Sequence, residues 1–131
     1  MLAVGVDMIE VARVAASIER HGQRFLDRVF TAQEQAYCNG RVASLAGRFA
    51  VKEAVGKAFG TGIGDIDWVE VEVVCDAQGK PDLALHGKAQ ALAAARNLHG
   101  WAISLSHTDT HAVGMAVALA APKITTDDNE E

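Results

Sequence analysis

The chain has 131 residues, half of them hydrophobic, and a net charge of −5, which fits a single folded domain with a substantial core. The acidic balance argues against nucleic-acid binding. No apolar run reaches the roughly 18–20 residues that span a bilayer, so we expect neither a membrane partner nor a signal peptide. Cys38 and Cys75 lack the spacing of a metal or redox site, so free thiols and a cytoplasmic location are expected.

The hydrophobic pattern predicts an α+β domain in which helical blocks separate the strands and a hairpin closes the chain. In chain order we expect a strand at 2–7, helices at 10–21 and near 24–28, a short helix opened by the capping box Thr31–Glu34, a helix at 43–59, strands at 66–75 and 82–86, a helix at 88–98 closed by Gly100, and strands at 101–107 and 112–120. The domain is expected to cover residues 1–121, and the acidic tail 122–131 is predicted to be disordered.

The first predicted strand ends on Asp7, directly ahead of a helical pattern. An aspartate at such a junction can simply cap the helix. It can also bind a metal if a second carboxylate lies beside it, because Mg²⁺ takes one or two protein carboxylates and completes its shell with water and phosphate oxygens.

The helix predicted at 43–59 supplies a candidate for that second carboxylate. Glu53 and Lys57 lie one turn apart, about 40° around the axis. Their neighbours on that side are small and leave room for a ligand: Ala46, Ala50, Gly56 and Gly60. The alternative is an ordinary solvent-exposed ion pair, worth roughly 0.2–0.5 kcal/mol.

The same helix carries a second polar stripe, formed by Arg48 and Lys52. From it, Arg48 could reach a nucleotide phosphate or form an ordinary ion pair. The remaining arc is the expected core face: Val51, Ala54, Val55 and Ala58. The helix ends in Gly60–Thr61–Gly62, whose glycines can expose backbone N–H groups or adopt positive φ.

Basic residues concentrate near the start of the chain. Residues 1–60 carry eight Lys/Arg against six Asp/Glu, and residues 61–131 carry four against eleven. Arg13 and Arg20 lie seven residues apart on one helix face, and Arg24 and Arg28 follow. Such charges commonly form a solvated face.

These motifs resemble those of the holo-[acyl-carrier-protein] synthases, the short type of 4′-phosphopantetheinyl transferase. The resemblance runs from about residue 2 to 120. It rests on Gly5-Val-Asp7 with Arg13, on the long motif from Gly47 to Gly62, and on two shorter stretches, Gln78-Gly-Lys-Pro81 and Ser104-Leu-Ser-His-Thr108. It implies a mostly antiparallel sheet packed with helices, and a homotrimer in which adjacent subunits share each active site.

The resemblance also implies a reaction. Phosphopantetheine moves from coenzyme A to a serine of an apo acyl carrier protein, releasing adenosine 3′,5′-bisphosphate, in support of fatty acid biosynthesis. Asp7 and Glu53 match the family's Mg²⁺ ligands, and Lys57 its pyrophosphate-binding lysine. Positioning and charge neutralisation dominate such a transfer. Glu53, a metal-bound water and Lys57 are each candidates for the general base.

The remaining site residues also follow from the resemblance. Those expected to contact coenzyme A are Arg48, Lys57, Gly60, Thr61, Gly62, Gly79, Lys80, Pro81, His107 and Thr108. The carrier protein is expected to dock its acidic helix on Arg13, Arg20, Arg24 and Arg28.

Two positions depart from the wider family. Ile9 stands where larger superfamily members have another acid, which suggests that water completes the metal shell. Gln78 replaces an Asn of some short members, which leaves only backbone contacts expected there.

Two other functions fit the sequence less well. A non-catalytic module on the same scaffold would have no reason to keep Asp7, Glu53 and Lys57 together. An ATP-dependent phosphotransferase would need a Walker A or kinase-type glycine-rich loop, and the sequence has neither.

Overall fold

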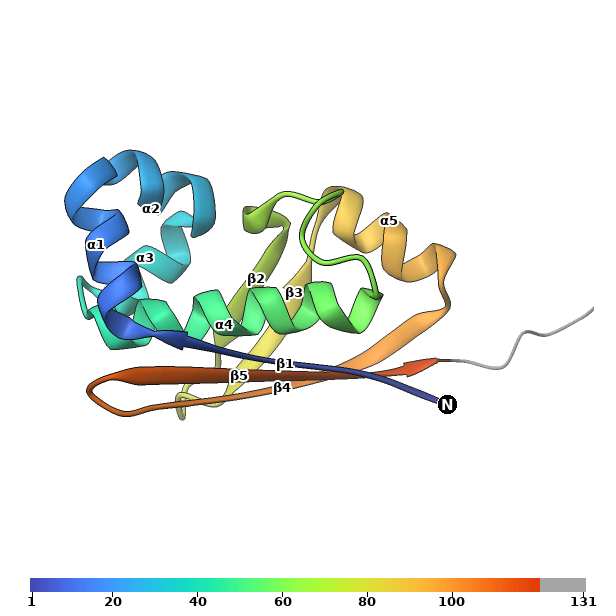
Figure 1. Ribbon diagram of the computed structural model, residues 1–131. Coiled ribbons are helices and arrows are strands. Elements are labelled where there is room, and N and C mark those ends of the chain that lie inside the picture. The colour runs from blue at the N-terminus through green and yellow to red at the C-terminus, as the bar shows by residue number, and fades with distance from the viewer. Residues whose placement is uncertain (121–131) are drawn as a thin grey trace, which may run out of the picture.

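The chain is organised around one long helix, α4 (Val42–Phe59), which lies across one face of a three-stranded sheet (Figure 1). This computed structural model describes residues 1–120, so the tail predicted at 122–131 lies outside the described residues. The elements before α4 are β1 (Leu2–Glu10), α1 (Val11–His21), α2 (Gln23–Val29) and α3 (Ala32–Cys38). Those after it are η1 (Trp68–Glu70), β2 (Val71–Cys75), β3 (Pro81–Leu85), α5 (Gly87–Ala95), β4 (Leu98–His107) and β5 (His111–Ala120).

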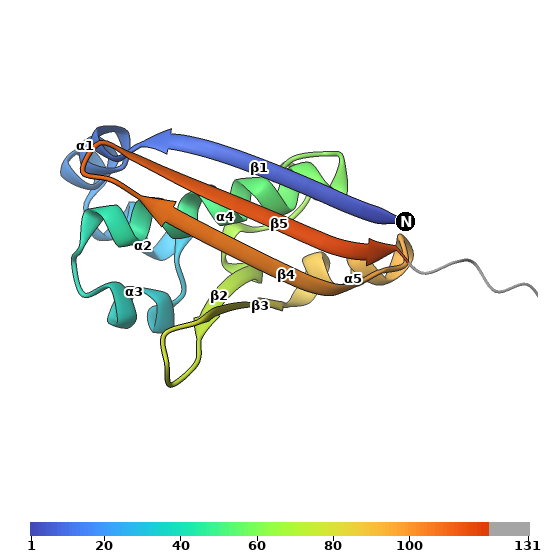
Figure 2. The same ribbon diagram turned by 90° about the horizontal axis from the view of Figure 1, so that it is seen from below.

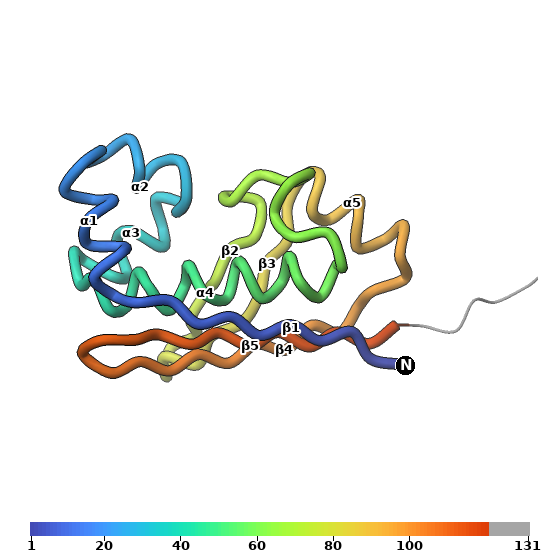
Figure 3. Tube along the Cα trace, viewed as in Figure 1, coloured from blue at the N-terminus to red at the C-terminus, as the bar shows by residue number. Residues whose placement is uncertain are grey.

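Both sheets are antiparallel, as predicted. The larger has the strand order β1-β5-β4, and the smaller pairs β2 with β3. Figure 2 shows the larger sheet from the side opposite α4, where its three strands lie uncovered. Helices α1 to α3 gather over the N-terminal half of α4 and near the β4–β5 turn, as the chain trace in Figure 3 also shows. Among residues 1–120, none of the helices has the length and apolar character needed to cross a bilayer.

Helix α4 approaches the sheet closely because glycines stand at the crossing. A Cβ on Gly5 of β1 would lie 2.9 Å from both the carbonyl carbon of Ala54 and the backbone nitrogen of Ala58. On β5, a Cβ on Gly114 would lie 2.5 Å from the carbonyl carbon of Ala50. Since Gly114 pairs with Asp7 in the sheet, this close packing fixes β1 directly beside the motif helix.

Helix α4 is buried on almost every side. The sequence pattern had predicted burial of one face only, that of Val51, Ala54, Val55 and Ala58. Its first half packs with α1, α2 and α3 around Val14, Phe30 and Leu45, and its second half packs with both sheets and α5. The stripe of Arg48 and Lys52 is buried too, with 5% and 0% of the residue exposed.

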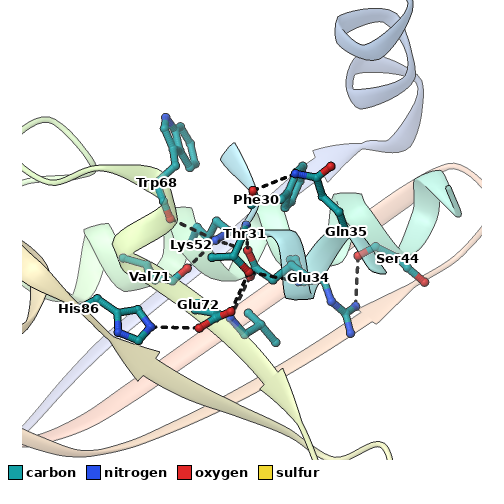
Figure 4. A network of polar contacts seen from close by, with 12 residues as sticks. Phe30, Thr31, Glu34, Gln35, Ser44, Lys52, Trp68, Val71, Glu72 and His86 are labelled. Carbon is teal, nitrogen blue, oxygen red and sulfur yellow. Dashed lines mark hydrogen bonds and ion pairs between the residues drawn. The ribbon is translucent and has the colours of Figure 1, made fainter. Parts of the chain in front are cut away.

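A buried polar network explains how Lys52 tolerates this position (Figure 4). Its Nζ donates to Glu34 Oε1 at 2.9 Å and to the carbonyl oxygens of Trp68 and Val71. The other oxygen of Glu34 accepts from the backbone N–H of Val73 at 2.8 Å, and the capping box with Thr31 is formed as predicted. The network therefore joins α3, α4 and β2 at fixed relative positions.

Several predicted boundaries were wrong, among them that of the first strand, which continues past residue 7 to Glu10. Residues 66–70 are not strand, because Asp67 and Glu70 form their own capping box around the 3₁₀ turn η1, and β2 begins only at Val71. Helix α5 ends at Ala95 rather than near 98, because Asn97 adopts a left-handed φ of 56° and the chain then enters β4 ahead of Gly100.

Candidate active site

Asp7, Glu53 and Lys57 come together where β1 runs along α4. Lys57 Nζ donates to Asp7 Oδ1 at 3.0 Å and to the carbonyl oxygen of Val6 at 3.0 Å. The Lys57 side chain is 53% exposed and that of Asp7 19% exposed, so this ion pair faces an opening rather than the core. Strand β1 continues to Glu10, so Asp7 lies inside the strand and does not cap α1.

Glu53 lies beside this ion pair, and its surroundings disfavour its negative charge. Burial raises the pKa of Glu53, the nearby charge of Asp7 raises it further, and Lys57 opposes both effects. Lys57 pairs with Asp7 rather than with Glu53, so an added cation beside the two carboxylates would compensate the charge of Glu53.

A cavity of about 400 Å³ opens against the two carboxylates. Its walls are partly apolar, and the side chains that line it with Asp7 and Glu53 are Met8, Ile9, Arg13, Val14, Ser17, Phe25 and Phe49. Phe49 stands one helical turn before Glu53, so its place on this face could have been found from the i, i+4 spacing. The position of Phe25 in the cavity wall could not have been predicted from sequence spacing, because it depends on how α2 packs.

A second cavity, of about 270 Å³, lies at the other face of α4, near the β2–β3 turn. It is lined by Tyr37, Arg41, Ser44, Arg48, Cys75, Gly79, Pro81 and Leu105. Three of the predicted coenzyme A contacts, Arg48, Gly79 and Pro81, therefore share one cavity. No sequence pattern pointed to the other lining residues Tyr37, Arg41 and Cys75.

Arg48 is the unusual residue of this second cavity. One of its terminal nitrogens donates to the carbonyl oxygen of Ser44 at 3.2 Å and the other to Cys75 Sγ at 3.3 Å, while its buried Nε has no partner among residues 1–120. Its guanidinium also lies over the ring of Tyr37, 4.7 Å from the centroid. Within residues 1–120 no carboxylate pairs with Arg48, so its charge is free to meet an anion.

The other predicted contacts are more dispersed. His107 and Thr108 line a third cavity, of about 190 Å³, at the β4–β5 turn, and Met8 borders both this cavity and the carboxylate cavity. Lys80 lines a separate cavity beside Trp101. The residues Gly60, Thr61 and Gly62 follow the end of α4, with φ of 88° at Gly60 and 74° at Gly62, so the predicted positive φ is confirmed.

The basic residues lie on the helical side of the molecule. Arg13 lines the carboxylate cavity, and Arg24 and Arg28 line a neighbouring one of about 220 Å³ that shares Phe25 with it. Arg20 is exposed in the last turn of α1. A cationic surface therefore adjoins the two carboxylates.

Comparison with protein families places most of the chain in one group. Residues 3–116 match the model of the 4′-phosphopantetheinyl transferase superfamily. The holo-[acyl-carrier-protein] synthase of Herpetosiphon aurantiacus is 43% identical over 126 residues, covering 91% of this chain and 99% of that protein. That of Protochlamydia amoebophila is 47% identical over 120 residues, covering 88% and 96%.

Solved structures agree with this grouping. The holo-[acyl-carrier-protein] synthase of Helicobacter pylori in complex with coenzyme A superposes with a TM-score of 0.82 at 26% identity, covering 88% of this chain and 99% of that one. The corresponding enzyme of Neisseria meningitidis gives 0.80 at 30% identity, covering 89% and 97%. The α+β fold described above is therefore the fold of these enzymes.

Proposed function

The chain belongs to the 4′-phosphopantetheinyl transferase superfamily, among its holo-[acyl-carrier-protein] synthases, and we propose that Asp7, Glu53 and Lys57 carry its transfer of phosphopantetheine from coenzyme A to an apo acyl carrier protein. The observation that supports this assignment is that Asp7 of β1 and Glu53 of α4 line one cavity, while Lys57 of α4 donates a hydrogen bond to Asp7. The acceptor is a serine hydroxyl, and the nucleotide product is adenosine 3′,5′-bisphosphate.

We further propose that Asp7 and Glu53 bind Mg²⁺. The donor set fits a hard cation, since both groups are carboxylates, and burial together with the nearby charge of Asp7 raises the pKa of Glu53. Within residues 1–120 no cluster of three or more His, Cys, Asp or Glu side chains forms a complete protein shell, so water and substrate oxygens would supply the remaining ligands. When bound, the ion would neutralise charge on the pyrophosphate of coenzyme A.

Lys57 then serves as a fixed positive charge at the reacting phosphorus. Both of its present partners, Asp7 Oδ1 and the Val6 carbonyl oxygen, are acceptors, so Lys57 acts here as a hydrogen-bond donor. Its long, half-exposed side chain can exchange one of these partners for a phosphate oxygen. Positioning and charge neutralisation account for catalysis of this kind.

We propose that coenzyme A extends from the carboxylate cavity toward the cavity of Arg48, whose side chains would hold its nucleotide. The uncompensated charge of Arg48, 5% exposed and facing a cavity with Gly79 and Pro81, supports a phosphate site there. The other proposed contacts are Lys80, Gly60, Thr61, Gly62, His107 and Thr108.

The carrier protein is proposed to dock on Arg13, Arg20, Arg24 and Arg28. Opposite charge between this surface and an acidic partner would steer the encounter and orient the serine toward the carboxylate cavity that Arg13 borders.

We also propose the homotrimer with shared active sites that the family resemblance implies, and the uncovered face of the larger sheet supports a contact between subunits. Large apolar side chains are exposed there, among them Leu2 (62%), Val4 (58%), Val6 (55%) and Met8 (67%) on β1, with Met115 (44%) and Leu119 (48%) on β5. Register places Leu2 opposite Leu119 and Val6 opposite Met115, so these side chains form one continuous apolar surface. Such a surface marks a subunit contact, and sedimentation equilibrium should give three chains of 13.8 kDa.

We propose a cytoplasmic role in fatty acid biosynthesis, carried by a domain of residues 1–121 with 122–131 as a tail. The two free cysteines fit a reducing compartment.

The decisive experiment is the intact mass of an apo acyl carrier protein after incubation with this protein and coenzyme A, with Mg²⁺ or with EDTA. We expect a gain of one phosphopantetheine group with Mg²⁺ only. Glu53→Gln should abolish the gain while keeping the thermal unfolding transition, and the exposed Glu19→Gln should behave as wild type. Normal Mg²⁺-dependent transfer by Glu53→Gln would remove Glu53 from the site.

A further inference from the structure

We infer that Cys75 is a site of reversible covalent modification by anionic low-molecular-weight disulfides, and that this modification closes the Arg48 cavity. The part concerning coenzyme A rests on the function proposed above. Cys75 stands at the last position of β2 and contributes to the wall of the 270 Å³ cavity, so solutes in that cavity reach its sulfur.

The thiol lies against a buried positive charge. A terminal nitrogen of Arg48 donates to Cys75 Sγ at 3.3 Å. The nucleophile in thiol–disulfide exchange is the sulfur atom of a cysteine, and this contact fixes that atom beside a positive charge that can hold an anionic disulfide. The other cysteine, Cys38, is a natural contrast, because it is 0% exposed and burial raises the pKa of its thiol.

The cavity itself selects anions. None of its lining residues is acidic, and two of them, Arg41 and Arg48, are arginines. Arg48 is more than nine-tenths buried, has no carboxylate partner within residues 1–120 and leaves its Nε without an acceptor. A buried charge in this condition stabilises an anion that enters the cavity. A disulfide bearing carboxylates or phosphates is therefore held where its sulfur atoms can meet Cys75.

The exchange balances without any further reactant. The Cys75 thiol gives its proton to solvent, and the thiolate attacks one sulfur of the disulfide. The bond between the two sulfurs of the small molecule breaks, a mixed disulfide forms at Sγ, and the departing thiolate takes a proton from solvent. Cys75 is oxidised and half of the disulfide is reduced. An added dithiol reverses the reaction.

The attached group would occupy the space proposed for a phosphate of coenzyme A. Modification should therefore raise the Kd for coenzyme A by at least about tenfold, since it removes Arg48 from the ligand, and reduction should restore it. This links use of coenzyme A to the oxidation state of the cell's small thiols.

The test measures intact mass and modified peptides after incubation with three probes: glutathione disulfide, coenzyme A disulfide and the cationic cystamine. We expect one adduct, at Cys75, formed at least about tenfold faster with the two anionic probes than with cystamine, once the rates are divided by those for a free cysteine peptide. The faster of the two anionic probes distinguishes a carboxylate-bearing from a phosphate-bearing source. In Arg41→Gln the anionic preference should fall, and Cys75→Ser should form no adduct.

Three results would overturn the inference: modification of Cys38 at an equal rate, equal normalised rates for cystamine and the anionic probes, or unchanged coenzyme A binding by the modified protein. The adduct and the coenzyme A Kd are measured without a carrier protein. A failure of transfer by the untreated protein would instead count against the proposed function alone.

Discussion

Replacing Gly5 by alanine should damage the active site without touching any catalytic side chain. The added Cβ would lie 2.9 Å from the carbonyl carbon of Ala54, about 0.5 Å inside the 3.4 Å at which ordinary contact begins, and closer still to the Ala54 oxygen. These are backbone atoms of a helix buried on almost all sides, so β1 must move away. We expect a loss of about 1–3 kcal/mol in the free energy of unfolding, as for other overpacked sites.

The same movement separates Asp7, two residues along β1, from Glu53 and Lys57. A misplacement of about 1 Å can cost on the order of 100-fold in rate. The free energy of unfolding would be measured by urea denaturation, and the rate by transfer of phosphopantetheine to a carrier protein. Gly64→Ala is the matched control, because no atom of the described residues 1–120 lies within 4 Å of a Cβ at that exposed position. A Gly5→Ala protein with wild-type stability and rate would refute the argument that this close approach positions Asp7.

Three further predictions concern charge. Arg13→Glu combined with Arg20→Glu should lower kcat/KM for the carrier protein about tenfold at low salt and leave the Kd for coenzyme A unchanged; unchanged carrier kinetics would make these arginines a solvated face. Lys52→Met should cost about 3–5 kcal/mol in urea denaturation, because it strands the buried Glu34 carboxylate, and adding Glu34→Gln should recover part of that loss. Glu72→Gln should destabilise by about 1 kcal/mol at pH 7. Burial raises the pKa of Glu72, but hydrogen bonds from Thr31 and His86 bring it below its ordinary 4.5. The difference between wild type and Glu72→Gln should therefore be full above pH 4.5 and shrink as the pH falls through the lower, folded-state pKa; a gap that stays constant to pH 3 would contradict this.

Local sequence patterns were sufficient to predict features that depend on a single helix, strand or turn. The spacing of Glu53 and Lys57 is a property of one helix, and the capping box at Thr31 is a property of four residues. The α+β organisation and the antiparallel hairpin also followed from the order of the elements.

Features that depend on contacts between distant segments could not be predicted from the sequence patterns. Lys52 has the same pattern as a solvent-exposed lysine, and its burial depends on Glu34 and on carbonyl groups from distant segments. The contact of Arg48 with Cys75 joins residues 27 positions apart. At Asn97, a local left-handed turn ended α5 where alanine-rich composition predicted more helix.

Helix α4 carries Glu53 and Arg48 five residues apart, about 7.5 Å along its axis and about 140° around it. Because it is a single rigid body buried between both sheets, a change that slides or rotates it must alter the carboxylate and arginine cavities in the same step. Anyone engineering the protein for a modified coenzyme would therefore do better to vary the β2–β3 turn at 76–80, which borders the arginine cavity but not the carboxylate cavity, and to leave the helix untouched.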